Sequence, residues 1–378
     1  MARGPALVCP ACATAWDGDL RTYRCPACDG PFSLAPAPLD PAAARTGAGL
    51  GRYAAWIPVP AVSLGEPTTP LVELPWRGAT ATLKLEGALP TGSFKDRGAA
   101  VLVGWLREQG VRDVVEDSSG NAGAALAAYC ARAGIACTLF VPEHASPGKL
   151  TQGRAHGAHV VRVPGPRPNA TAALLERLAT SDAVYATHLW NPLYQAGTRT
   201  FAFELWEQLD GRAPDAILIP TGAGGLLLGA ALGFAALAEA GVIDRVPRLY
   251  AVQSEACAPL VRALAAGSTR PEDTDGGPSI AEGMLIARPP RGVEALAAIR
   301  ASGGGGIAVS DEAIWAASDR LAASGVLAEP TSAATWAALD LLAGRGELEP
   351  GERVVLAITG HGLKTEAAIR AHLDERKA

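Results

Sequence analysis

The chain has 378 residues, of which 49% are hydrophobic and 19% charged, and its formal net charge at pH 7 is −5. This composition excludes a disordered chain, and the negative charge disfavours a dedicated nucleic-acid binder, which usually carries a basic face. No uncharged apolar run of about 18 residues resembles a membrane span, and residues 1–20 lack the apolar core of a signal peptide. We therefore expect a cytoplasmic protein of about two or three domains that binds neither nucleic acid nor a membrane.

Two short cysteine motifs lie near the N-terminus. Cys9-Pro-Ala-Cys12 and Cys25-Pro-Ala-Cys28 are separated by twelve residues, and two such knuckles are typical of a structural Zn²⁺ site with four thiolate ligands. A ribbon without metal and a pair of disulfides are the alternatives, and a reducing cytosol disfavours the disulfides. Residues 1–45 therefore predict a small zinc-ribbon-like segment followed by a Pro/Ala linker. The remaining cysteines lie in apolar stretches and are expected to be buried: Cys130, Cys137 and Cys257.

After this linker, β-rich runs alternate with alanine-rich helical runs, the pattern of an α/β protein with parallel strands. The expected strands are 82–85, 114–116, 138–141, 159–163, 216–219, 249–253 and 354–358. The expected helices are 94–109, 123–133, 146–156, 170–178, 198–209, 226–239, 258–266, 311–323 and 333–342. Two glycine-rich or polar segments are expected to be loops, namely 273–278 and 302–306.

The first notable strand-to-helix turn contains Lys95. It reads Pro90-Thr91-Gly92-Ser93-Phe94-Lys95-Asp96-Arg97-Gly98, and Ser93 is placed to cap the helix that follows. Lys95 then lies in the first turn, where the positive end of the helix dipole disfavours an ammonium and favours the neutral amine that attacks an aldehyde. By itself a helical lysine is usually solvated. Only five lysines are candidates for such chemistry: Lys84, Lys95, Lys149, Lys364 and Lys377.

Three further turns combine small and hydroxyl residues, as expected where ligands bind at the carboxyl edge of an open sheet. Asp117-Ser118-Ser119-Gly120-Asn121-Ala122-Gly123 places hydroxyls and backbone amides at a helix N-terminus, which would suit a carboxylate; an ordinary Asn/Gly turn fits equally well. Thr221-Gly222-Ala223-Gly224-Gly225 permits close approach of a phosphate, and its spacing matches neither common nucleotide-binding motif. Thr359-Gly360-His361-Gly362 presents a hydroxyl after a strand, with a simple helix cap as the alternative.

Together these segments resemble the threonine synthase family, within the fold type II, tryptophan-synthase-β-like enzymes that use pyridoxal phosphate (PLP). The resemblance covers roughly residues 50 to 370. The motifs that carry it agree in wording and order: 90–98, 119–121, 148–150, 329–333 and 359–364.

The resemblance implies two open, twisted, mainly parallel sheets with helices. A large PLP-binding domain would comprise 46–100 and 201–378, and a small mobile domain would comprise 101–200. Closure of the small domain on the substrate would exclude water. Members of the family commonly form dimers, so a homodimer is expected.

The resemblance also implies residue roles. Lys95 would carry PLP as a Schiff base and then act as the base at the substrate Cα. Asn121 would bond the 3′-oxygen of the cofactor, and Thr359 its pyridine nitrogen. The remaining implied contacts are Gly222, Ala223, Gly224 and Gly225 for the cofactor phosphate, and Ser118, Ser119, Gly120 and Ala122 for the substrate and its carboxylate.

Several positions differ from the family's motifs where the substrate phosphate of O-phosphohomoserine would bind, in addition to the phosphate of PLP. Ala122 and Ala223 replace polar residues, and a stretch usually written Asn-Ser-x-Asn-Pro-x-Arg reads His188-Leu189-Trp190-Asn191-Pro192-Leu193-Tyr194. Charge-assisted hydrogen bonds are worth about 1.5–3 kcal/mol each, so their loss should weaken phosphate binding severely. Gly224-Gly225-Leu226 and Ser279-Ile280-Ala281-Glu282-Gly283 instead resemble serine/threonine dehydratases.

These departures predict a less charged, partly aromatic substrate pocket lined by Trp190 and Tyr194. His188 and Glu282 are candidate acid/base groups in it, although a core histidine and a solvated glutamate are at least as common.

The sequence thus predicts a threonine-synthase-like, PLP-dependent lyase that performs β- or γ-elimination or replacement on a small-molecule amino acid. O-phosphohomoserine is a disfavoured substrate. The alternatives are a serine/threonine dehydratase-type deaminating lyase, a specialised amino-acid synthase of a biosynthetic pathway, and a non-catalytic PLP-binding protein with an interaction role.

Overall fold

The computed structural model describes residues 5–35, 38–43, 45–145, 147–349 and 351–376. The chain divides into two compact units. Unit 1 comprises Met1–Pro67 and Lys95–Thr198, and unit 2 comprises Thr68–Phe94 and Arg199–Ala378. Residues 46–67 and 95–100, which the sequence placed in a large domain, therefore group with unit 1.

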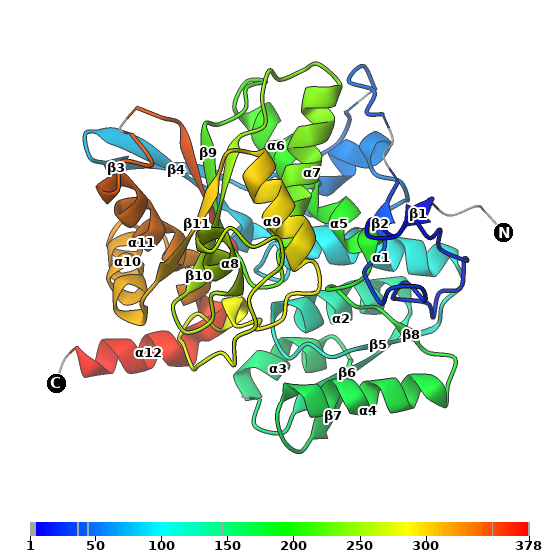
Figure 1. Ribbon diagram of the computed structural model, residues 1–378. Helices are drawn as coiled ribbons and strands as arrows, with labels where there is room; N and C mark the ends of the chain where they lie inside the picture. The colour runs from blue at the N-terminus through cyan, green and yellow to red at the C-terminus, as the bar shows by residue number, and fades with distance from the viewer. Residues whose placement is uncertain (1–4, 36–37, 44, 146, 350, 377–378) are drawn as a thin grey trace. The chain divides into compact units, whose positions relative to one another are not determined.

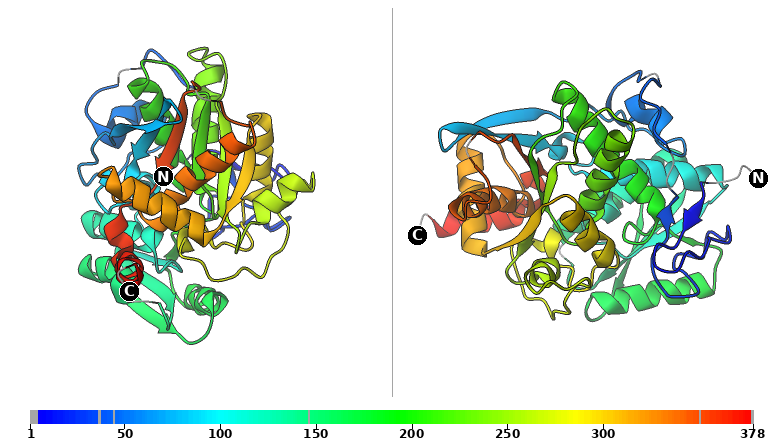
Figure 2. Two further views of the ribbon diagram at one scale, coloured as in Figure 1. Left: turned by 90° about the vertical axis from the view of Figure 1, so that its left-hand side faces the viewer. Right: turned by 45° about the horizontal axis from the view of Figure 1, so that its top comes forward.

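Unit 2 is built on a six-stranded sheet with the strand order β11-β10-β9-β12-β4-β3, in which only β3 is antiparallel to its neighbour. Both faces are covered: α11, with α10 against it, packs on one face, and α7, α8 and α9 pack on the other (Figures 1 and 2). Burial on two faces explains why these strands read as continuous apolar runs. The strands are β3 Leu71–Trp76, β4 Ala79–Leu85, β9 Ala216–Pro220, β10 Arg248–Ser254, β11 Gly305–Val309 and β12 Val354–Ile358. The helices are η2 Glu86–Ala88, α6 Thr200–Gln208, α7 Gly225–Glu239, α8 Pro259–Ala265, η3 Glu282–Met284, α9 Gly292–Ala301, α10 Asp311–Ala323, α11 Pro330–Gly344, η4 Gly362–Thr365 and α12 Glu366–Glu375.

Unit 1 holds a two-stranded antiparallel ribbon, β1-β2, and a four-stranded parallel sheet with the order β7-β6-β5-β8. Its strands are β1 Leu7–Val8, β2 Ser33–Leu34, β5 Asp113–Glu116, β6 Ala136–Pro142, β7 His159–Val163 and β8 Val184–Tyr185. Its helices are η1 Gly49–Trp56, α1 Lys95–Glu108, α2 Asn121–Ala133, α3 Pro147–Ala155, α4 Arg167–Ala179 and α5 Pro192–Thr198.

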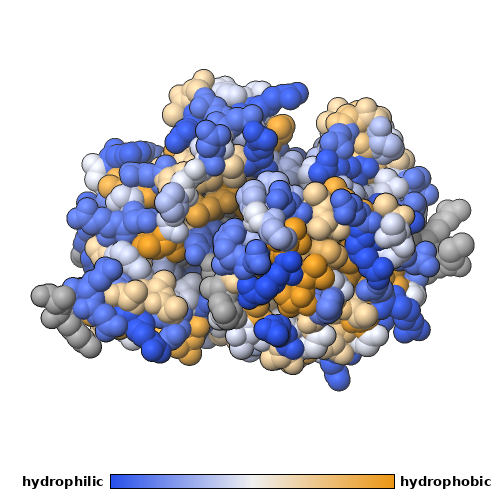
Figure 3. Space-filling view, turned by 90° about the horizontal axis from the view of Figure 1, so that it is seen from below, coloured by the Kyte–Doolittle hydropathy of each residue, from blue (hydrophilic) through white to orange (hydrophobic). Residues whose placement is uncertain are grey.

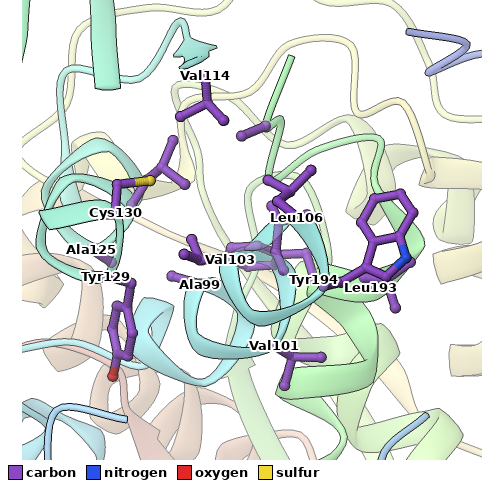
Figure 4. Packing of buried hydrophobic residues seen from close by; sticks show 14 of the residues in the cluster. Ala99, Val101, Val103, Leu106, Val114, Ala125, Tyr129, Cys130, Leu193 and Tyr194 are labelled. Carbon is purple, nitrogen blue, oxygen red and sulfur yellow. The ribbon is translucent and has the colours of Figure 1, made fainter. Parts of the chain in front are cut away.

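Alternation along β5 separates the two sides of the unit 1 sheet. Val114 belongs to the apolar cluster formed with α1, α2 and α5, whereas Val115 belongs to the cluster with α4. Figure 4 shows part of the first cluster, where Ala99 and Val103 of α1 lie near Tyr194 of α5. Because side chains alternate along a strand, the next residue, Glu116, is directed to the same side as Val114, toward α1 and α5.

The predicted α/β architecture with mainly parallel sheets is confirmed, and all the expected strands are present. The expected loop at 302–306 is wrong in part, because Gly305–Val309 forms β11. A Cβ at Gly306 would lie 2.8 Å from the Leu264 side chain, so glycine is needed where this strand packs closely. Glycine is rare in strands, so the sequence pattern did not indicate a strand here. The expected helix 198–209 corresponds to α6 Thr200–Gln208, and the helix before it, α5 Pro192–Thr198, was not predicted. Ser146, where another helix was expected to begin, lies outside the described residues.

A buried lysine crosslinks β4 and α6 within unit 2. Lys84 is 0% exposed and forms an ion pair with Glu204, which is 1% exposed. The Lys84 Nζ atom also donates to the Thr69 carbonyl oxygen at 3.0 Å and to Gln208 Oε1 at 2.6 Å. Glu204 accepts hydrogen bonds from both the amide and the hydroxyl of Thr69. This lysine is therefore committed to a structural network.

Replacing Lys84 with methionine is expected to destabilise unit 2 by about 3–5 kcal/mol, because the substitution leaves the Glu204 carboxylate buried without its cation. Chemical denaturation followed by circular dichroism measures this loss. The double variant Lys84→Met/Glu204→Leu should recover much of the stability, since it removes both charges. A single variant as stable as the wild type would contradict the prediction.

No helix in the described part of the chain is long and apolar enough to cross a bilayer. On the face drawn in Figure 3, hydrophilic and hydrophobic residues are interspersed.

Candidate active site

Lys95 is the first residue of α1, directly after the turn that joins unit 2 to unit 1. Within unit 2 this turn is held against the end of β12: the Phe94 amide donates to the Thr359 carbonyl oxygen at 2.9 Å, and Ser93 bridges to Gly360. The prediction that Ser93 caps the helix is wrong. Its hydroxyl is buried and makes no hydrogen bond within the described residues, and α1 begins at Lys95, two residues further on.

Tyr194 fixes the first turn of α1 in unit 1. Its hydroxyl donates to the Lys95 carbonyl oxygen at 3.0 Å, and the residue is 3% exposed. Gly98 makes this contact possible, because a Cβ at this position would lie 2.3 Å from the Tyr194 ring. Gly197 serves the same purpose one turn further along α5, where a Cβ would lie 1.9 Å from the Arg97 carbonyl oxygen. Tyr194, which was predicted to line the substrate pocket, thus packs against α1, the helix that begins with Lys95.

The Ser118–Asn121 turn leads into α2, which begins at Asn121. The preceding residue, Gly120, offers the helix no side-chain cap, and its amide donates to Ser118 Oγ at 3.4 Å. A Cβ at Gly123 would lie 2.1 Å from the Ser118 carbonyl oxygen, so the turn folds tightly onto the helix. Helix N-terminal amides without a side-chain cap suit an anion such as a carboxylate.

His188 forms a buried pair with Glu116 in unit 1. The distance between His188 Nδ1 and Glu116 Oε1 is 2.8 Å, and the histidine side chain is 10% exposed. The His188 ring also meets the edge of Tyr194, with the ring centroids 5.9 Å apart. The sequence singled out His188 and missed Glu116. An acidic residue ending an apolar strand at the carboxyl edge of a sheet was the signal that could have found it.

Burial sets the protonation of this pair. It raises the pKa of Glu116 well above the usual value, with a further contribution from the neighbouring Asp117 charge. Smaller opposing contributions come from Arg167 and from the backbone amide of His188. Burial, followed by the charges of Lys95 and Arg167, lowers the pKa of His188 well below its usual value. Burial therefore favours the neutral form of both groups.

The glycine turn of unit 2 runs from Thr221 to Gly225, between β9 and α7. Gly224 is the N-cap of this 15-residue helix, has φ +84°, and provides no side-chain cap. A Cβ at Gly225 would meet nothing within 4 Å, whereas one at Gly222 would lie 2.7 Å from the Gly283 carbonyl oxygen. The turn is therefore closed on one side by η3 and leaves space beside the backbone of Gly225 at the helix N-terminus.

Two hydroxyls meet at the end of β12 in unit 2. Thr359 Oγ1 lies 2.9 Å from Ser332 Oγ, and the amide of Gly360 donates to Ser332 Oγ at 2.9 Å. Ser332 stood in a motif that carried the family resemblance, but no role was predicted for it. The preceding residue, Thr331, accepts from the Gly283 amide at 3.2 Å, which links this corner to η3. Glu282, on η3, is exposed.

These residues fit pyridoxal phosphate. The glycine turn lies at a helix N-terminus and lets a phosphate approach the backbone closely, because a Cβ at Gly225 would meet nothing within 4 Å. The hydroxyl pair of Ser332 and Thr359 suits a neutral partner such as a ring nitrogen. A buried hydroxyl without a partner, as at Ser93, is costly unless a bound polar group satisfies it. Lys95 supplies the amine. Each element is present within its own unit, in the chain order that the family resemblance implies.

The four N-terminal cysteines also form a cluster, with all four Sγ atoms within 4.8 Å of one another. The two knuckles share one conformation: the Ala13 amide donates to the Cys9 carbonyl oxygen at 2.9 Å, and the Asp29 amide to that of Cys25 at 2.8 Å. Ala13 and Asp29 have φ of 59° and 58°. The seven cysteines are all free, which excludes the alternative of two disulfides in this structure. Four thiolates at this spacing fit a tetrahedral metal ion.

The ribbon packs against the segment that carries His188 and Tyr194. Within unit 1, the Arg24 guanidinium lies 4.2 Å from the Trp190 ring centroid, and Tyr23 meets the edge of the Tyr185 ring at 5.1 Å. The Tyr185 hydroxyl donates to Asp117 Oδ1 at 2.9 Å. Trp190, which the sequence assigned to the pocket lining, is thus a packing partner of the ribbon.

Comparison with known proteins agrees with this geometry. The family described as "Pyridoxal-phosphate dependent enzyme" matches residues 62–360, and the chain belongs to this family. The threonine synthase of Methanocaldococcus jannaschii is 36% identical over 335 residues, which cover 85% of this chain and 82% of that protein. The resemblance to the threonine synthase family is therefore confirmed, and the protein is a PLP-dependent lyase. The alternative of a non-catalytic protein is disfavoured accordingly.

Solved structures extend the comparison. Serine racemase from Dictyostelium discoideum aligns with a TM-score of 0.68 and 26% identity, covering 78% of this chain and 92% of that one. A threonine deaminase from T.th. aligns with a TM-score of 0.65 and 28% identity, over 78% and 92% of the two chains. The predicted fold type II class is thus confirmed.

Proposed function

We propose that the protein catalyses β- or γ-elimination or replacement on an amino acid that carries no phosphate. The observation that carries this proposal is the buried environment of Tyr194, which occupies the position of an arginine in the threonine synthase motif. Its ring is 3% exposed and its hydroxyl donates to the Lys95 carbonyl oxygen, so this position supplies no cation for a substrate phosphate. Ala122 and Ala223 likewise lack the polar side chains of that wording.

The chain's own residues would divide the work as follows. The amides of the glycine turn would hold the cofactor phosphate, Thr359 would bond the pyridine nitrogen, and Asn121 would bond the 3′-oxygen. The Ser118–Gly120 turn, with Ala122 beside it, receives the substrate carboxylate. When bound, PLP withdraws electrons from the substrate Cα. Lys95 would hold the cofactor through its amine and would serve as the base that takes the Cα proton.

A deaminating lyase is one form of this activity, supported by the 28% identity to a threonine deaminase structure. A hydroxyl beside the ring nitrogen does not keep that nitrogen protonated, as a carboxylate would. The cofactor would then withdraw electrons less strongly, which favours expulsion of a leaving group over a long-lived carbanion. A specialised synthase that adds a nucleophile after elimination is the second candidate, supported by similarity to threonine synthases.

The test is a substrate panel with the PLP-loaded enzyme, scored by the change in cofactor absorbance and by product analysis. We expect unphosphorylated amino acids to change the absorbance and yield product. O-phosphohomoserine should release neither phosphate nor threonine. Formation of threonine and phosphate from it at a rate above that of every other amino acid would overturn the proposal.

We further propose that the cysteine cluster binds a structural Zn²⁺, with Cys9, Cys12, Cys25 and Cys28 as its ligands. Free cysteines support a reducing, cytoplasmic setting, and the family resemblance supports a homodimer. Light scattering after gel filtration measures the latter directly. We also propose that the small domain, predicted at 101–200, closes on the substrate and excludes water.

A further inference from the structure

Glu116 and His188 form a pair that the roles above leave unused. We propose that they donate a proton to the leaving group, and that the substrate is therefore an amino acid with a β-hydroxyl. The inference rests on the proposed elimination chemistry and deepens it by naming the substrate class. His188 would touch the leaving group as a catalytic residue, and Glu116 would position it and supply the proton.

The fold of unit 1 brings the pair to the candidate site. β5 and β8 are adjacent parallel strands, and the Ala186 amide donates to the Val115 carbonyl oxygen at 3.0 Å. The carboxyl ends of both strands therefore meet at one edge of the sheet, where ligands of open α/β sheets bind. Glu116 ends β5 on the side of the sheet that α1 covers. The same strand end continues directly into the Ser118–Asn121 turn.

The hydrogen bonds set the direction of proton flow. Glu116 is 1% exposed, and its Oε2 atom has no hydrogen-bond partner in the part of the chain that the structure describes. An isolated buried carboxylate is disfavoured, so the group is a carboxylic acid whose O–H donates to His188 Nδ1. The proton of the neutral imidazole then lies on Nε2.

The other ionisable groups around the pair do not replace it as proton source. Asp117 accepts from the Tyr185 and Thr171 hydroxyls, at 2.9 and 2.6 Å, so both its oxygens are engaged. Lys95 and Arg167 face His188 as cations, and Arg167 and the Cys137 thiol lie near Glu116. These cations disfavour an imidazolium and leave Glu116 as the acid of the group.

A hydroxyl is the leaving group that needs this pair. As Lys95 takes the Cα proton, the electrons of that bond form a Cα=Cβ double bond and the Cβ–O bond breaks. The departing oxygen keeps the bonding electrons and takes the Nε2 proton of His188, while the Glu116 proton moves to Nδ1. Water leaves, and the unsaturated amino acid is hydrolysed to an α-keto acid and ammonia. Solvent returns the proton to Glu116.

Substituting Glu116→Gln tests this directly, because glutamine still donates to Nδ1 but cannot pass on a proton. General acids contribute about 10²–10⁴-fold, so the rate of α-keto acid formation from L-serine should fall by about 10²-fold or more. β-Chloro-L-alanine loses chloride, which needs no proton, and its rate should change by less than about threefold. Glu116→Asp, which keeps an acid proton, should recover part of the L-serine rate, and His188→Gln should reproduce the selective loss.

A cofactor-independent readout accompanies the kinetics. The wild-type infrared spectrum at neutral pH should contain the C=O band of a buried carboxylic acid, and Glu116→Gln should lack it. Absence of this band from the wild type, or equal slowing of L-serine and β-chloro-L-alanine in Glu116→Gln, overturns the inference and leaves the elimination chemistry standing. Wild-type turnover of β-chloro-L-alanine without that of L-serine or L-threonine also overturns it. Loaded enzyme that eliminates from neither kind of substrate overturns the proposed function itself.

Discussion

Replacing Lys95 with alanine is expected to abolish covalent binding of PLP and to remove the base at the substrate Cα. Loss of the base alone lowers a rate by about 10²–10⁴-fold, and loss of the covalent linkage adds to this. Two measurements check the result: the absorbance band of the bound cofactor near the visible edge, and mass spectrometry of the borohydride-reduced protein. In the wild type we expect the reduced label on the peptide that contains Lys95.

Lys95→Arg is the matched variant, because it keeps the cation and the first turn of α1 but cannot form a Schiff base. Its backbone contacts are unchanged, since Tyr194 binds the carbonyl oxygen of residue 95 rather than its side chain. We expect Lys95→Arg to fold with wild-type stability and to lack the cofactor band. Label on Lys84 or Lys364 in the reduced wild type, or a normal band in Lys95→Arg, would exclude the assignment.

The outline of the fold was predictable because it follows from periodicity and turn chemistry. The apolar runs of β9, β10 and β12 are strands buried on both faces, and α10 begins at a serine that caps it, with Ser310 Oγ accepting from the Ala313 amide at 3.2 Å. β11 and α9 were not predicted, because glycine or proline residues at or before their first residues indicated loops. β11 begins with two glycines, which are rare in strands, and α9 closely follows Pro289-Pro290, a dipeptide typical of a loop.

The candidate site was predictable where the residues are local in sequence and not where they are assembled across it. Lys95 and the glycine turn each stand in one contiguous motif. The pair of Glu116 and His188 depends on the adjacency of β5 and β8, whose residues are separated by about 70 positions. The role of Tyr194 depends on Gly98, because only a residue without a side chain admits the ring to the first turns of α1. The pattern of a single sequence indicates neither which strands are adjacent nor which side chain packs against a given glycine.

Removing the metal from the cysteine cluster, by chelation or by Cys9→Ser/Cys25→Ser, is expected to unfold the ribbon and to destabilise unit 1. In the described residues the ribbon has two strands of two residues each, so we expect its fold to depend on the proposed Zn²⁺. A ligand present at about 1,000 times its dissociation constant stabilises a fold by about 4 kcal/mol. For a unit of this size that corresponds to a melting midpoint lowered by about 10 °C. Calorimetry with and without chelator measures the shift, and metal analysis should find one Zn²⁺ per chain.

The same treatment should reach the candidate site, because Arg24 and Tyr23 of the ribbon pack on Trp190 and Tyr185. Unfolding the ribbon exposes Trp190, two residues after His188, so the tryptophan emission should shift to longer wavelength. Trp190→Phe is the matched variant in which chelation should shift the emission less. Wild-type protein with no bound metal, or with a melting midpoint and emission that chelation leaves unchanged, would contradict a structural role for the cluster. If chelation lowers the melting midpoint but leaves the emission unchanged, the metal stabilises the ribbon without affecting the surroundings of Trp190 and His188.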